Sequence, residues 1–125
     1  MSTSILNIDQ VSIYQQDEII LENINININK GDFIYLIGKT GSGKSSLIKT
    51  LYADLKLKKG FISVGGFTLK DLKEKKIPFL RRKLGIVFQD FNLLQDRSVF
   101  DNLKFVLEAT EWSDKKKIKN RINEV

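Results

Sequence analysis

The chain has 125 residues, room for at most one small domain, and its hydrophobic content of 42% is ordinary for a folded globular protein. It contains no cysteine and no histidine, which excludes disulfides, thiolate metal sites and imidazole bases or ligands within these residues. Its longest apolar runs are about five residues, far below the roughly 20 that a membrane-spanning helix requires.

The net charge of +6 comes largely from basic clusters within residues 56–59, 73–76, 81–83 and 115–121. Aromatic side chains do not alternate with these basic residues, as they would in a groove for single-stranded nucleic acid. We therefore interpret the clusters as solvated helix faces and loops, and we expect no nucleic-acid partner. The alternative is a non-catalytic module that binds nucleic acid or an anionic membrane surface.

Residues 1–32 predict a small antiparallel sheet. The apolar positions within residues 4–14 and 19–21 indicate two extended stretches. Ile24, Ile26 and Ile28 then alternate with asparagines, which is the period of a half-buried strand. A turn over residues 30–32 ends this part of the chain.

Residues 33–97 predict a core of mixed strands and helices. The segment 33–37 is apolar at every position, which is typical of a parallel strand covered on both faces, and residues 86–88 indicate a second one. Residues 61–64 predict a short strand, and residues 69–83 a short helix and a loop, interrupted by Pro78. The helix expected over residues 46–52 has an apolar face made of Leu47, Ile48, Leu51 and Leu55.

Residues 98–125 predict the start of a helical part. Ser98 and Asp101 match a capping box, which indicates that a helix begins at Ser98. Ser113 resembles the N-cap of a further helix, with Asp114 in its first turn.

The segment 38–45 reads Gly-Lys-Thr-Gly-Ser-Gly-Lys-Ser and fits the phosphate-binding P-loop pattern. Glycines let backbone N–H groups approach phosphates closely, Lys44 brings a charge to the β- and γ-phosphates, and the Ser45 hydroxyl can ligate Mg²⁺. An ordinary glycine turn before a helix is the alternative, but an apolar strand before the loop and an amphipathic helix after it favour the nucleotide site. The candidate nucleotide-binding residues of this segment are Gly38, Lys39, Thr40, Gly41, Ser42, Gly43, Lys44, Ser45 and Ser46.

The loop, with Ser46 where threonine is usual, resembles that of ABC-type ATPases. Tyr14 lies 30 residues before Lys44, where that family places an aromatic residue that stacks on adenine. Gln89 follows Val-Phe as in the family's Q-loop, and the resemblance implies that its side chain faces Mg²⁺ and the γ-phosphate. Lys44 and Gln89 are thus the candidate catalytic residues, and Ser45 and Gln89 the candidate metal ligands. The alternatives are a core aromatic for Tyr14 and a plain solvent-facing side chain for Gln89.

Residues 77–90 and 93–102 resemble the FtsE-like branch of this family, with lipoprotein-release and macrolide-export ATPases as less similar alternatives. The resemblance implies an ATP hydrolase that uses ATP and Mg²⁺, forms an ATP-dependent homodimer and pairs with an FtsX-like integral membrane protein. It also implies a peripheral location on the cytoplasmic face of the inner membrane. Phe91, Leu93 and Leu94 would face the membrane partner, with ordinary core packing as the alternative.

The resemblance implies an α/β fold with a P-loop NTPase core of the ABC type and an N-terminal antiparallel β part. It covers only about the N-terminal half of a family member. The Ser-Gly-Gly-Gln signature, the apolar run ending in Asp-Glu and the switch histidine do not occur in these residues. We therefore expect a fragment that stops before the remaining core strands and that binds ATP without hydrolysing it, rather than a self-contained remnant.

Overall fold

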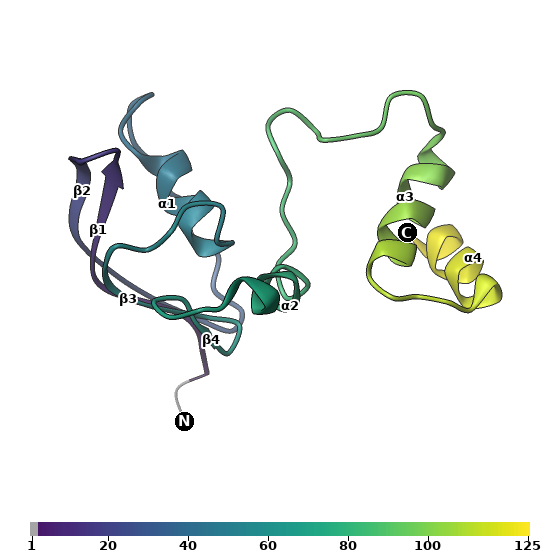
Figure 1. Cartoon of the computed structure of the whole chain (residues 1–125), viewed down its shortest axis with the longest axis horizontal. Helices are drawn as coiled ribbons and strands as arrows, with labels where there is room; N and C mark the ends of the chain where they lie inside the picture. The colour runs from purple at the N-terminus through teal and green to yellow at the C-terminus, as the bar shows by residue number, and fades with distance from the viewer. Residues whose placement is uncertain (1–2) are drawn as a thin grey trace. The chain divides into compact units, whose positions relative to one another are not determined.

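The computed structural model describes residues 3–125, which divide into two compact units (Figure 1). The first unit runs to Gly85, and the second spans Ile86–Val125. Among residues 3–125, no helix is both long enough and apolar enough to cross a membrane.

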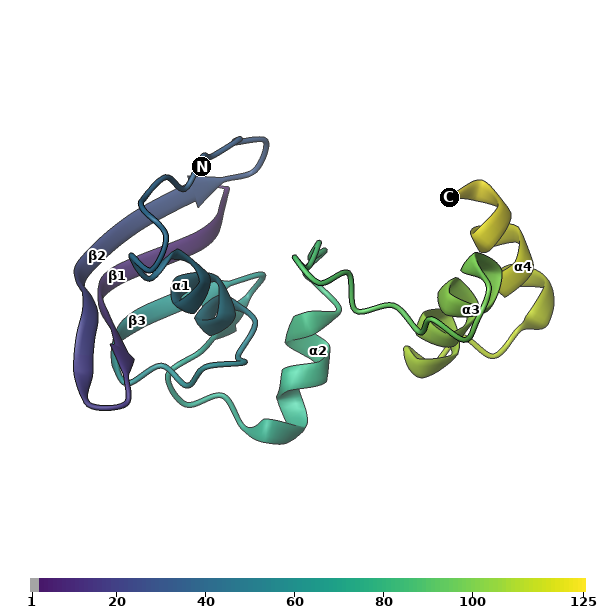
Figure 2. The same ribbon diagram turned by 90° about the horizontal axis from the view of Figure 1, so that it is seen from above.

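The first unit is built on a four-stranded antiparallel sheet with the strand order β2-β1-β3-β4. Figure 2 shows β1 lying between β2 and β3. The predicted antiparallel sheet is therefore confirmed, and it also takes in strands that follow the phosphate loop in sequence. The strands are β1 (Ser4–Gln15), β2 (Glu18–Asn29), β3 (Lys59–Val64) and β4 (Phe67–Thr68).

Strand β2 is half-buried, as its alternating sequence predicts. The side chains of Ile24, Ile26 and Ile28 are partly buried, whereas those of Asn25 and Asn27 are exposed. One face of β2 therefore packs on the core while the other meets water.

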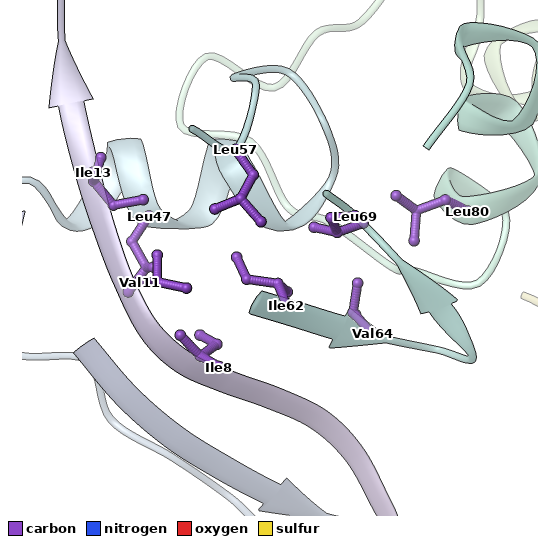
Figure 3. Close-up of a cluster of buried hydrophobic side chains, with 9 residues drawn as sticks. All are labelled: Ile8, Val11, Ile13, Leu47, Leu57, Ile62, Val64, Leu69 and Leu80. Carbon is purple, nitrogen blue, oxygen red and sulfur yellow. The ribbon is translucent and has the colours of Figure 1, made fainter. Parts of the chain in front are cut away.

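The core of the first unit lies between this sheet and two short helices, α1 (Lys44–Leu51) and α2 (Ile77–Arg81). Leu47 reaches it from α1 and Leu80 from α2, and Val11 and Ile62 at its centre are fully buried (Figure 3). The buried apolar side chains are Ile8, Val11, Ile13, Leu47, Leu57, Ile62, Val64, Leu69 and Leu80.

Two predictions about these helices are wrong in part. Pro78 does not interrupt a helix: it lies in the first turn of α2, where its missing N–H group has no helical partner to lose. That helix follows a 3-10 turn, η1 (Glu74–Lys76). In α1 the buried side chains are Leu47 and Thr50, whereas Ile48 is 41% exposed. The buried Thr50 hydroxyl group has a hydrogen-bond partner, because it donates to the Ser46 carbonyl oxygen (2.8 Å).

The prediction that residues 33–37 and 86–88 form buried parallel strands is wrong for this structure. Neither segment pairs with a strand among residues 3–125, and Ile37 and Val87 are 88% and 97% exposed. A buried parallel strand needs a neighbouring strand to pair with and cover on both faces. The four described strands instead belong to the antiparallel sheet, so these two apolar segments stay extended and exposed.

The second unit contains two helices, α3 (Val99–Ala109) and α4 (Lys115–Glu124). Ser98 caps α3 as predicted, because its hydroxyl oxygen accepts from the Asp101 N–H group (3.1 Å). The prediction of Ser113 as the cap of α4 is wrong: the Asp114 carboxylate accepts from the N–H groups of Lys116 and Lys117 (2.9 and 3.2 Å). Asp114 has the extended backbone of an N-cap residue, and its carboxylate is also favourable at the positive end of a helix.

The side chain of Asn102 on α3 makes hydrogen bonds to the segment that precedes this helix. Its side-chain oxygen accepts from the Leu94 N–H group (2.9 Å), and its side-chain nitrogen donates to the carbonyl oxygens of Leu94 (3.0 Å) and Ser98 (2.9 Å). Phe91 and Leu93 lie just before Leu94, the first residue that Asn102 contacts, and their side chains are 74% and 63% exposed. These two apolar side chains of the second unit are therefore largely exposed.

Candidate nucleotide-binding site

The phosphate loop leads directly into α1, which begins at Lys44, two residues earlier than predicted. Gly43 is the N-cap, and no side chain of the described residues caps the helix or places a carboxylate in its first turn. The first N–H groups of a helix have no partner within the helix and carry its partial positive charge. The start of α1 therefore offers hydrogen-bond donors to an anion.

The Lys44 ammonium group lies within the curve of the loop. It donates to the carbonyl oxygens of Gly38 and Lys39, the latter at 2.8 Å, and approaches the Ser42 hydroxyl oxygen at 3.3 Å. These contacts place a positive charge at the centre of residues 38–44. They also tie the first part of the loop to the helix that follows it.

Gly43, at the end of the loop, packs closely against the sheet. Gly43 has a φ of +98°, and a Cβ atom there would lie 2.7 Å from Cγ2 of Ile20 and 3.0 Å from Cγ of Leu21. Both residues belong to β2. A side chain at position 43 would therefore be strained in its backbone and would also push α1 away from the strand.

Tyr14 lies near the end of β1 that pairs with the part of β2 that Gly43 contacts. It pairs with Ile19, and its neighbour Ile13 pairs with Leu21, the residue that Gly43 contacts. The Tyr14 side chain is half-buried and is not part of the buried core. The first unit thus brings the candidate adenine residue and the end of the phosphate loop to the same part of the sheet.

Lys58 is a residue of this neighbourhood that the sequence analysis missed. Its ammonium nitrogen lies 5.5 Å from the centre of the Tyr14 ring and donates to the Gln16 carbonyl oxygen (2.8 Å). The only signal in the sequence is a lysine in a basic cluster just before a short strand. The pairing of that strand with β1, which brings Lys58 to Tyr14, cannot be seen in the sequence.

The remaining candidate residues differ in their surroundings. Ser45 is exposed in the first turn of α1, and Ser46 is half-buried beside it. Gln89 belongs to the second unit, where it is exposed in a turn. Its action together with the phosphate loop stays a prediction.

The loop fits a nucleoside triphosphate with Mg²⁺ in the chemistry of its groups. The loop curves tightly enough that a Cβ atom at Gly38 would lie 2.7 Å from the Ser42 hydroxyl oxygen, which would have to turn aside. Among residues 3–125 no three acidic, histidine or cysteine side chains gather into a metal site. Mg²⁺ bound to nucleotides takes most of its ligands from phosphates and water, so one hydroxyl such as that of Ser45 is a sufficient protein ligand.

Comparison with known families and proteins gives a consistent result. Residues 21–125 match the family described as ABC transporter. The cell division ATP-binding protein FtsE of Streptococcus pneumoniae is 38% identical over 117 residues, which are 94% of this chain and 50% of that protein. FtsE of Bacillus subtilis is 45% identical over 105 residues, 84% and 46% of the two chains. The methionine import ATP-binding protein MetN of Helicobacter hepaticus is 41% identical over 112 residues, 90% and 32% of the two chains.

Solved structures with the same fold include a dimeric ATP-binding cassette in a post-hydrolysis state, bound to ADP and phosphate. It has a TM-score of 0.81 at 27% identity and covers 95% of this chain and 54% of its own. The structure of cbiO1 from Clostridium perfringens, part of the ABC transporter complex cbiONQ, has a TM-score of 0.84 at 29% identity and covers 98% of this chain and 49% of its own. The chain thus spans about half the length of the relatives it matches. With the family matched from Leu21 to Val125, this chain belongs to the ABC transporter family, in the part that carries its ATP-binding fold.

Proposed function

We propose that this chain is the ATP-binding part of an FtsE-like ABC system, which couples ATP binding and hydrolysis to a membrane partner in cell division. The observation that carries the proposal is the Lys44 ammonium group, held in the curve of a glycine loop at the uncapped start of α1. Support for the division branch comes from the FtsE relatives, at 38% and 45% identity.

In this proposal the described residues have separate roles. Lys44 and the start of α1 bind the phosphates, Ser45 ligates Mg²⁺ and Tyr14 stacks on adenine. Gln89 offers its side-chain oxygen to Mg²⁺ and the γ-phosphate. The full-length protein forms an ATP-dependent homodimer and lies peripherally on the cytoplasmic face of the inner membrane beside an FtsX-like partner, to which Phe91, Leu93 and Leu94 dock.

An importer subunit is the second candidate, because a methionine import protein matches at 41% identity. ATP binding by this chain is common to both candidates. The membrane protein that co-purifies with the full-length protein distinguishes them: an FtsX-like protein supports the division role, and a methionine permease contradicts it.

The test of the proposal is ATP–Mg²⁺ binding without turnover. Phosphoryl transfer needs a residue that orients the attacking water, and neither an apolar run ending in Asp-Glu nor Ser-Gly-Gly-Gln occurs in these 125 residues. We expect calorimetry to detect ATP binding and a phosphate-release assay to detect no hydrolysis. Turnover that survives purification and disappears in Lys44→Ala would contradict the second expectation.

Replacement of Tyr14 by alanine should weaken ATP binding about tenfold, because a base stacked on an aromatic side chain contributes roughly 1–3 kcal/mol. Binding of tripolyphosphate, which has no base, should not change. Tyr14→Phe is the matched control and should keep the wild-type affinity. The adenine role of Tyr14 is refuted if Tyr14→Ala binds both ligands as the wild type does.

A further inference from the structure

The contact between Lys58 and Tyr14 gives the nucleotide site a feature beyond the phosphate loop. The Lys58 ammonium nitrogen lies 5.5 Å from the Tyr14 ring centre, within the range in which a cation is attracted to an aromatic face. It also donates to the Gln16 carbonyl oxygen at 2.8 Å. The ammonium is therefore held between the ring and the turn that joins β1 to β2.

The sheet fixes the place from which Lys58 reaches Tyr14. Ser12 on β1 pairs with Lys59, the first residue of β3, so Lys58 lies just before the strand that pairs with β1, and Ser12 is two residues from Tyr14. Gly60 lies so close to β1 that a Cβ atom would be 2.5 Å from the Gln10 carbonyl oxygen. The backbone that follows Lys58 is thus held against β1 by the pairing of Lys59 and the close approach of Gly60.

We propose that Lys58 is a positioning residue for the base of a purine nucleoside triphosphate. This inference rests on the proposed function, in which Tyr14 stacks on adenine. A cation over one face of the ring leaves the opposite face for the base and holds the ring in one orientation before the nucleotide arrives. The ordering of a side chain is a cost of binding, so a ring that is ordered in advance binds the base more tightly.

A different role for Lys58 must be separated from this one. Its positive charge could attract the triphosphate directly, without Tyr14. That role would act on any polyphosphate, whereas a role through the ring acts only on a ligand that has a base. Lys59 is the matched control, because it is the adjacent exposed lysine and its replacement removes the same charge.

The experiment compares Lys58→Met, Lys58→Arg and Lys59→Met in the full chain, with ATP–Mg²⁺ and tripolyphosphate–Mg²⁺ as ligands in calorimetry. We expect Lys58→Met to weaken ATP binding about threefold and to leave tripolyphosphate binding unchanged, since an exposed cation–π contact is a modest interaction. Lys58→Arg, which keeps a cation over the ring, should restore the affinity for ATP. Lys59→Met should bind both ligands as the wild type does.

Two outcomes overturn the inference without touching the proposed function. One is an unchanged affinity for ATP in Lys58→Met, and the other is an equal loss for ATP and tripolyphosphate. A double-mutant cycle gives a further check: in a Tyr14→Leu background, Lys58→Met should have no added effect, and a full threefold loss there contradicts coupling through the ring. If the wild-type chain binds no ATP at all, the proposed function fails, and this inference fails with it.

Discussion

Replacement of Lys44 by alanine should lower the affinity for ATP–Mg²⁺ by at least about 100-fold. A hydrogen bond to a charged group contributes roughly 1.5–3 kcal/mol, and the ammonium group can make two such bonds to the β- and γ-phosphates. The change also removes the contacts by which Lys44 holds the carbonyl oxygens of Gly38 and Lys39. Both effects act in the same direction, because a loop without this tether has more conformations to lose when the phosphates bind.

Lys49→Ala is the matched control for this experiment. Lys49 lies in the last turn of the same helix and is exposed, so its removal changes the net charge equally but leaves the loop intact. We expect calorimetry to find near wild-type affinity for this variant, and thermal unfolding to show that both variants remain folded. Equal affinities of Lys44→Ala and the wild type would refute the nucleotide site.

Replacement of Gly60 by alanine should destabilise the first unit by about 2–5 kcal/mol, from a strained backbone and overpacking together. Gly60 has a φ of +98°, and a Cβ atom there would lie 2.5 Å from the Gln10 carbonyl oxygen and 2.6 Å from the Val11 Cα atom. Backbone atoms of a paired strand cannot move aside as the end of a side chain can. The contact falls where the register of β1 against β3 shifts between Asp9 and Ser12, so relief would require the two strands to separate.

Gly66→Ala isolates the steric part of this effect. Gly66 also has a positive φ, +86°, but nothing lies within 4 Å of the position of a Cβ atom. Its replacement should therefore cost only the backbone strain, about 1–2 kcal/mol. Chemical denaturation followed by circular dichroism measures both variants, and equal losses for the two would show that the approach of Gly60 to β1 carries no cost.

Local signals in the sequence predicted much of the first unit. The glycine loop, the alternation in β2 and the strand before Gly65 all depend on residues close together in the chain, and all three occur. The position of Lys58 against Tyr14 depends instead on which strand pairs with β1. That pairing brings Val11 and Ile62 into one buried core, a contact between distant residues that no local pattern reveals.

The errors have physical causes as well. The apolar segments 33–37 and 86–88 have the composition of buried strands, but a strand also needs partners for its backbone, and the described residues supply none. Ser113 and Asp114 are both good caps in sequence, and only the backbone conformation decides between them. The local pattern thus predicted which residues can form an element, and long-range contacts decided which did.

The central place of β1 in the sheet has a consequence for cooperativity. Strands β2 and β3, which precede and follow the phosphate loop and α1, both pair with β1. If β1 separated from both neighbours, the segment from residue 30 to residue 58 would therefore lose its attachment to the sheet at both ends. A ligand that binds the loop stabilises, by mass action, the state in which β1 remains paired. It would therefore slow the exchange of amide hydrogens in β1, although β1 supplies none of the phosphate contacts.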